Sequence, residues 1–378
     1  MTAALQSIID RVQAASAHAT PLRLVGHGSK DFYGDSLQGE LLDCSTYSGI
    51  VSYEPSELVV TLRAGTPLRE LEAALAEKGQ CLAFEPPRFG ASAGTCGGMV
   101  AAGLSGPARA SVGSVRDYVL GVRLINGRAE HLTFGGQVMK NVAGYDVSRL
   151  MPGAMGTLGV ITEISLKVLP VAPAEATLVF QLDQASALNQ LHRWGAQPLP
   201  LNASCWVRDD NAPAAPELLF VRLRGAVAAV ESACLKMLQD VSGSRIDNAQ
   251  AAADWEACRD LRLPFFSESG KTGESLGLWR LSVAQTTPAF DLPWAQLVEW
   301  HGAQRWLWAP ESARLEMSQL ALQAGGYATL FRASHAAGTS ARGQFNPLNS
   351  VQQQIHQRLK AEFDPAGIFN RGRMLAFL

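Results

Sequence analysis

The stretch Met139-Lys-Asn-Val-Ala-Gly-Tyr-Asp-Val-Ser-Arg-Leu-Met-Pro-Gly-Ala-Met-Gly-Thr-Leu-Gly-Val-Ile-Thr-Glu-Ile-Ser-Leu-Lys-Val-Leu169 places three glycines before a predicted strand. Gly153, Gly156 and Gly159 are spaced three residues apart, and the following residues alternate between apolar and polar side chains. Glycine permits positive φ and, because it lacks a Cβ, lets backbone approach another surface closely. The pattern therefore predicts either a crowded turn before a buried strand or a backbone wall against which a ligand lies.

Two more glycine-rich stretches lie upstream and favour the ligand interpretation. Gly26-His27-Gly28-Ser29-Lys30 follows a predicted strand at Pro21–Val25, and Gly94-Thr95-Cys96-Gly97-Gly98 lies within a longer run of glycine and alanine. A strand that ends in glycine, serine and lysine can surround a phosphate with backbone N–H groups. The first stretch is not a Walker A loop, because the Gly-x-x-x-x-Gly-Lys spacing is missing. It is not the dinucleotide fingerprint Gly-x-Gly-x-x-Gly either, because Asp31 occupies the third glycine position.

Composition indicates a globular protein with more than one domain. The chain has 378 residues, of which 47% are hydrophobic and 17% charged, and this length exceeds what one hydrophobic core usually supports. The formal net charge of −2 argues against a nucleic-acid-binding face. No window approaches 18 uncharged apolar residues, so no direct membrane insertion is expected, and the N-terminus does not resemble a signal peptide.

The six cysteines do not form a metal-binding pattern. No two of them have Cys-x-x-Cys spacing, so neither a zinc site nor an iron–sulfur cluster is predicted. They are typical of the reduced thiols of a cytoplasmic protein.

Periodicity predicts alternating helices and strands along the whole chain. An Asn126-Gly127 turn predicts a β-hairpin. After residue 174 the pattern predicts a β-α-β-β-α layer, and the last helix carries Val351, Ile355, Leu359 and Phe363 on one stripe. Trp294, Trp300, Trp306 and Trp308 are interpreted as domain core or, alternatively, as part of a docking face. The other predicted helices are 2–15, a helix that begins at Leu68, 184–195, 226–240 and 311–324, and the other strands are 58–64, 81–84, 160–166, 176–180, 203–207, 218–224, 278–283 and 305–309.

Together the motifs resemble a known family. They run in the order Arg23–Lys30, Arg63–Leu71, Gly94–Gly98, Gly113–Asp117, Asn141–Asp146, Gly153–Thr162 and Phe363–Asn370. This series resembles the vanillyl-alcohol-oxidase (PCMH) type of FAD-binding domain, and within it the smaller FAD-binding subunits of bacterial glycolate oxidases. The resemblance implies an α+β fold, with a two-subdomain FAD-binding domain at 1–173, a smaller α+β cap domain at 174–340, and a C-terminal helix and tail at 341–378 that return to the flavin domain.

The resemblance also implies a set of FAD-binding residues. The pyrophosphate would lie against the first two glycine stretches, and the adenosine portion against the third. By motif, the set is Gly26, His27, Gly28, Ser29, Lys30, Gly94, Thr95, Gly97, Gly98, Gly156, Thr157, Gly159, Val160, Ile161 and Asn370. His27 stands where some relatives attach FAD covalently, but we expect it to contribute only its backbone N–H, with FAD bound non-covalently.

The sequence assigns no catalytic residue. Relatives that oxidise 2-hydroxy acids carry paired histidines with a carboxylate in the cap domain, and that set is not found here. His335 is a candidate general base, although an exposed loop histidine is the simpler interpretation.

Three hypotheses follow. In the first, the chain is the flavin subunit of a glycolate-oxidising complex with a larger FAD-containing catalytic subunit and an iron–sulfur subunit, cytoplasmic and held at the inner membrane through these partners. Its small-molecule substrate would be a 2-hydroxy acid such as glycolate or D-lactate. In the second, it is a self-sufficient FAD oxidoreductase acting on a 2-hydroxy acid or a sugar lactone. In the third, it is a scaffold subunit whose flavin is structural or lost.

Overall fold

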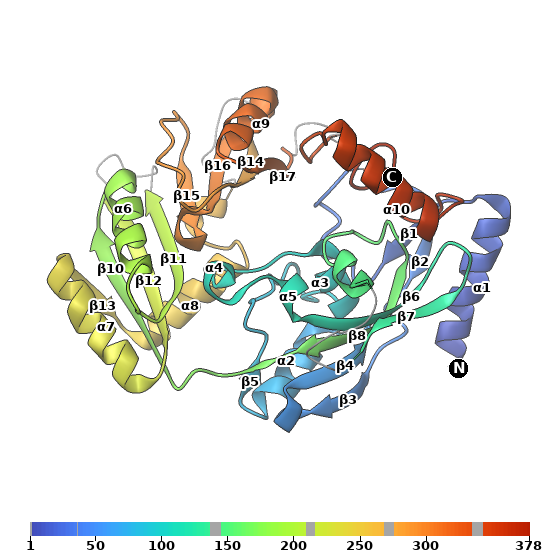
Figure 1. Cartoon of the computed structure of the whole chain (residues 1–378), viewed down its shortest axis with the longest axis horizontal. Coiled ribbons are helices and arrows are strands. Elements are labelled where there is room, and N and C mark those ends of the chain that lie inside the picture. The colour runs from blue at the N-terminus through green and yellow to red at the C-terminus, as the bar shows by residue number, and fades with distance from the viewer. Residues whose placement is uncertain (1, 36, 137–144, 209–215, 268–275, 335–342) are drawn as a thin grey trace. The chain divides into compact units, whose positions relative to one another are not determined.

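The computed structural model describes residues 2–35, 37–136, 145–208, 216–267, 276–334 and 343–378 (Figure 1). The chain divides into two compact units, the first formed by residues 1–104, 114–171 and 340–378 and the second by residues 105–113 and 172–339. Residues 105–113, which lie inside the stretch expected to belong to the FAD-binding domain, thus pack with the second unit.

The first unit is built on a five-stranded antiparallel sheet with the strand order β3-β4-β8-β6-β7. Its strands are β3 (Ile50–Glu54), β4 (Val59–Arg63), β6 (Val119–Ile125), β7 (His131–Gly135) and β8 (Val160–Lys167). The central strand β8 is the one predicted from the glycine-rich stretch. Six of its eight residues are buried, so it is covered on both faces, as its β-branched residues favour.

The C-terminus completes a smaller parallel layer in the same unit. Strand β1 (Leu22–Val25) pairs in parallel with β2 (Glu40–Asp43), and Phe369 forms a parallel bridge to Leu22 on the other side. The N–H of Leu22 donates to the carbonyl of Ile368 at 2.7 Å. Helix α1 (Ala3–His18) packs its buried face onto this layer in one core with Ile368 and Phe369. The expected return of the C-terminus to this part of the fold is therefore confirmed.

Helix α10 (Ser350–Phe363) leads into that tail and ends in a buried ion pair. Lys360 Nζ lies 2.8 Å from Asp364 and also donates to the carbonyls of Thr157 and Phe369, at 2.7 and 3.0 Å. Asp364 accepts the N–H groups of Ile368 and Phe369. Unlike Lys360, Val351 and Ile355 at the start of the predicted apolar stripe are exposed.

The remaining described helices and strands of the first unit are short, apart from α2. They are α2 (Leu68–Ala76), β5 (Gln80–Cys81), α3 (Cys96–Ala102), α5 (Val115–Tyr118) and β9 (Leu169–Pro170).

The second unit contains an eight-stranded antiparallel sheet with the order β13-β10-β12-β11-β15-β16-β14-β17. Its elements are α4 (Arg109–Val112), β10 (Ala174–Gln181), α6 (Gln184–Gly195), β11 (Leu201–Arg208), β12 (Glu217–Gly225), α7 (Val227–Asp240), β13 (Gly243–Ile246), α8 (Asn248–Arg259), β14 (Leu276–Ser282), β15 (Gln296–Glu299), β16 (Gln304–Pro310), α9 (Arg314–Gln323) and β17 (Tyr327–Arg332). Five strands extend the sheet beyond the predicted β-α-β-β-α layer. Strands β14 and β16 match the predicted strands 278–283 and 305–309, whereas β13, β15 and β17 were not predicted.

The two faces of this sheet carry different helices. Leu178, Phe180 and Val221 point to the face covered by α6 and α7 and form one core with Trp194 and Met237. Because side chains alternate along a strand, Thr177 and Arg222 point to the other face. There they contact Trp255 of α8, whose indole N–H donates to Thr177 Oγ1 at 3.0 Å and whose ring lies 4.8 Å from the Arg222 guanidinium.

The predicted two-residue hairpin turn at Asn126-Gly127 is wrong. Strands β6 and β7 are joined by residues 126–130, with Ala129 at φ +61°. The Asn126 side chain accepts the N–H groups of Arg128 and Glu130, and the N–H of Gly127 donates to the carbonyl of Phe363. The loop therefore opens to receive the end of α10, a contact with a segment distant in sequence.

The tryptophan cluster serves mainly the core of the second unit. Trp300, Trp306 and Trp308 are buried, and Trp294 is half-buried. The docking interpretation is therefore wrong for the three buried rings.

Replacing Lys360 with Met should lower the free energy of unfolding by about 3–5 kcal/mol, because Asp364 would stay buried without its counter-ion. The matched control is Lys236→Met in α7. Lys236 forms an i,i+4 ion pair with Asp240, and its side chain is 48% exposed. An exposed pair contributes less than about 1 kcal/mol. Denaturant unfolding measures both variants, and equal losses would contradict the structural role given to Lys360.

Candidate functional site

A groove in the first unit is formed where three distant segments meet. Its walls are the turn after β1 (residues 26–31), helix α3, and the turn that leads into β8 (residues 155–161). Asn370 and Arg373 of the C-terminal tail complete the lining. Asn370 joins two of these walls, because its amide accepts the N–H of Leu24 and donates to the carbonyl of Met155 at 2.7 Å.

Most of the residues predicted to bind the cofactor line this groove. Thirteen of the fifteen do so: Gly26, His27, Gly28, Ser29, Lys30, Thr95, Gly97, Gly98, Gly156, Gly159, Val160, Ile161 and Asn370. Gly94 and Thr157 lie just outside it. A Cβ on Gly94 would come within 2.7 Å of Ser29 Oγ, and the Thr157 hydroxyl donates to the carbonyl of Ala154 at 2.8 Å.

The turn after β1 offers unused hydrogen-bond donors. Within the described part of the chain, the N–H groups of residues 26–30 make no hydrogen bond to protein, whereas the carbonyl of Gly28 accepts the N–H of Asp31. Gly28 takes φ +66°, which favours glycine. Consecutive free N–H groups in a tight turn bind anions, so this turn fits a diphosphate group.

Helix α3 contributes in a different way. Thr95 caps this short helix, and Gly103 ends it in the left-handed region. The N–H of Gly97 donates to the carbonyl of Ala64 at 2.7 Å, and that of Gly98 to Thr95 Oγ1 at 3.2 Å. This helix therefore supplies a close wall of small residues rather than free donors.

Lys30 brings a positive charge to the groove. Burial lowers the pKa of its ammonium group to about 8, because the charged form is poorly solvated there. Its Nζ also lies 5.7 Å from the centre of the Phe89 ring. A bound anion would offset the missing solvation and favour the charged form.

Arg373 was not among the predicted residues. Its buried guanidinium donates to the carbonyls of five residues in one turn, Lys30, Asp31, Tyr33, Gly34 and Asp35. It thereby fixes the conformation of the segment that follows the free N–H groups. The only signal in the sequence is its place three residues after Asn370 in the C-terminal motif.

The described histidines supply no evident general base. His27 lines the groove, while His335 and the motif residues Asn141–Gly144 lie outside the described residues. In the second unit, the His301 ring nitrogens lie 3.0 Å from the hydroxyls of Ser111 and Ser204. Burial lowers the pKa of His301 to about 4, so its ring is neutral and engaged on both nitrogens at neutral pH.

Comparison with known proteins identifies the family. The FAD binding domain family matches residues 3–135. The chain is 44% identical over 373 residues to the glycolate oxidase subunit GlcE of Escherichia coli (strain K12), an alignment that covers 99% of this chain and 98% of the relative. This chain belongs to the GlcE family of glycolate oxidase subunits. It is thus a member of the FAD-dependent oxidoreductases, as its motifs indicated.

Two further likenesses agree with this family. The chain is 30% identical over 141 residues to the glycolate oxidase subunit GlcD of Bacillus subtilis (strain 168), covering 37% of this chain and 30% of that one. It is also similar to the solved structure of p-cresol methylhydroxylase with substrate bound, with a TM-score of 0.67, 12% identity and coverage of 98% and 87% of the two chains. The structural likeness confirms the predicted α+β fold class for this GlcE-family chain.

Gly98→Val should abolish FAD retention while the protein folds. A Cβ on Gly98 would meet only Thr95 Oγ1, at 3.2 Å, so the chain can accept the side chain at the edge of the groove. Overlap with a ligand would cost about 3 kcal/mol, or roughly 100-fold in affinity. The measurement is flavin content after gel filtration.

The matched control is Gly195→Val at the end of α6, where no heavy atom lies within 4 Å of the added Cβ. It should retain FAD. Gly97 and Gly156 are less informative positions, because a Cβ there would first meet Ala64 Cβ at 2.7 Å or Asn370 Nδ2 at 2.8 Å. Wild-type flavin content in a folded Gly98→Val protein would exclude the groove as the FAD site.

Proposed function

We propose that this chain is the FAD-carrying subunit of a membrane-associated complex that oxidises glycolate to the 2-oxo acid, with D-lactate as a second candidate substrate. The observation that carries the proposal is the 44% identity to a glycolate oxidase subunit along nearly the whole of both chains. In this proposal the first unit binds FAD, and the second unit serves as the cap domain.

The groove is proposed to hold FAD non-covalently through the predicted residues. The free N–H groups of residues 26–30 would bind the pyrophosphate, and Lys30 would neutralise part of its charge. Residues 156–161 and Asn370 would contact the adenosine portion. Bound FAD would supply the two-electron acceptor for oxidation of the hydroxy acid.

Electrons are proposed to leave the flavin through other chains. The cysteine spacing offers no iron–sulfur ligand set, and among the described histidines and carboxylates no paired set faces the groove. We therefore infer two companions, a larger FAD-containing catalytic subunit and an iron–sulfur subunit. No helix in the described ranges is long and apolar enough to span a membrane, and in this proposal the chain reaches the cytoplasmic side of the inner membrane through its partners.

The purified chain should release its flavin into solution on acid precipitation, since His27 is proposed to contribute only its backbone N–H. Flavin fluorescence of the supernatant and the pellet measures the outcome. Flavin that stays with the precipitated wild-type chain but is lost from a His27→Asn variant would show covalent attachment through this histidine.

Glycolate oxidation with an artificial electron acceptor should be slow for the lone FAD-loaded chain and fast for the reassembled complex. A complex that contains the Gly98→Val chain should lose most of that activity. Comparable turnover by the lone chain would favour the self-sufficient enzyme. Full activity of the complex with a flavin-free Gly98→Val chain would favour the scaffold interpretation.

A further inference from the structure

The second unit contains a cavity with a volume of about 480 Å³ on the α8 face of its sheet. One wall is formed by α8, through Ala251, Trp255 and Cys258, and another by Cys205 and Val207 of β11. Sites for small molecules usually have volumes of roughly 300–1,000 Å³. An engineered apolar cavity of about 150 Å³ already binds benzene, so the cavity has room for a larger ring system.

Five aromatic side chains contribute to the lining of this cavity. They are Phe220, Trp255, Phe265, Trp294 and Trp308. Two of the indole N–H groups are used within the protein, since Trp255 donates to Thr177 Oγ1 and Trp308 to the carbonyl of Phe265 at 2.8 Å. These two rings therefore offer carbon and π surfaces to a ligand rather than hydrogen-bond donors.

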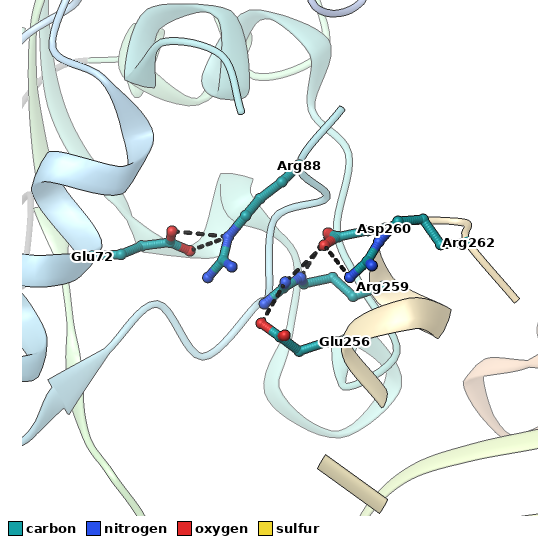
Figure 2. Close-up of polar contacts among 6 residues, drawn as sticks. All are labelled: Glu72, Arg88, Glu256, Arg259, Asp260 and Arg262. Atoms are coloured by element: carbon teal, nitrogen blue, oxygen red, sulfur yellow. Dashed lines mark hydrogen bonds and ion pairs between the residues drawn. The ribbon is translucent and has the colours of Figure 1, made fainter. Parts of the chain in front are cut away.

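Helix α8, which forms one wall of the cavity, is stabilised at both ends by local contacts. The Asp247 side chain caps its first turn. At its other end Arg259 bonds to Glu256 and Asp260, and Arg262 lies 3.5 Å from Asp260. Figure 2 shows this network, together with the separate Glu72–Arg88 pair of the first unit. The contact of α8 with the sheet is made by Trp255, whose indole N–H donates to Thr177 Oγ1 at 3.0 Å.

The interior of the cavity is uncharged. Among the described lining residues only Arg208 and Asp254 carry charge; both are exposed, and Arg208 lies 3.7 Å from Glu217. The Cys258 thiol donates to the buried Glu299 carboxylate at 3.3 Å. A hydrogen bond with Cys205, burial and the nearby carboxylate raise the pKa of this thiol, so the sulfur is neutral and does not attract cations.

We propose that this cavity binds an uncharged, planar aromatic molecule of two or three rings. A buried ion would find charged partners only at the exposed Arg208 and Asp254, and a cluster of water molecules would have few polar neighbours. Flat rings, in contrast, can stack on the tryptophan and phenylalanine side chains. This inference does not depend on the flavin groove.

The test uses the full chain and the neutral fluorescent probe N-phenyl-1-naphthylamine. We expect saturable 1:1 binding to the wild type. Ala251→Phe places a phenyl ring in the cavity and should weaken binding at least tenfold. The matched control, Ala253→Phe, adds the same ring on the exposed side of α8 and should bind as the wild type does.

Circular dichroism shows whether Ala251→Phe folds. If it does not, Val207→Phe is used in its place, because it fills the same cavity from β11. Naphthalene should displace the probe, and n-decanol should not. Absence of saturable binding, wild-type affinity in a folded filled variant, or displacement by n-decanol as effective as by naphthalene would each overturn the proposal.

Discussion

Lys360 and Asp364 form a buried ion pair whose remaining hydrogen bonds run to two separate segments of the first unit. The ammonium group donates to the carbonyls of Thr157 and Phe369, and the carboxylate accepts the N–H groups of Ile368 and Phe369. Removing two charges from water is costly unless every remaining donor and acceptor is satisfied. The pair is therefore stable only when the C-terminal tail lies against both β1 and the turn before β8.

The groove depends on this arrangement, because its walls come from segments far apart in sequence. Asn370 links β1 to the turn at Met155, and Arg373 donates to five carbonyls between Lys30 and Asp35. With those carbonyls engaged, the N–H groups of residues 26–30 face no protein acceptor in the described structure. The turn that carries the donors is local, whereas the segment after it is fixed by tertiary contacts of the tail.

In the second unit, the two faces of the sheet are packed in different ways. Its sheet is covered by α6 and α7 on one face, where buried aliphatic and aromatic side chains pack closely. On the other face Arg222 and Thr177 hold Trp255 by specific contacts, and the cavity lies beside them. Polar residues on this face position an aromatic wall, whereas the opposite face is filled by apolar packing alone.

The sequence alone determined the elements in which local pattern and burial agree. The alternation around Val160 predicted β8, and the helix at 184–195 has the same bounds in the structure. The glycine spacing and the motif order also predicted the family and most of the residues that line the groove. Glycine at these positions allows the backbone to approach a neighbouring group closely, and this property can be read from the local sequence.

Only the tertiary structure decided how the individual groups are used. Gly98 and Gly28 both stand in predicted cofactor motifs, but the N–H of Gly98 is used by the Thr95 cap, whereas that of Gly28 is free of protein acceptors within the described chain. The Asn126 loop is wider than a two-residue turn because the N–H of Gly127 donates to the carbonyl of Phe363. In the second unit, Trp255 of α8 is held against the sheet by Thr177 and Arg222, and it forms part of the cavity wall. The contacts of Gly127 with Phe363 and of Trp255 with Thr177 join segments distant in sequence, which composition and periodicity do not encode.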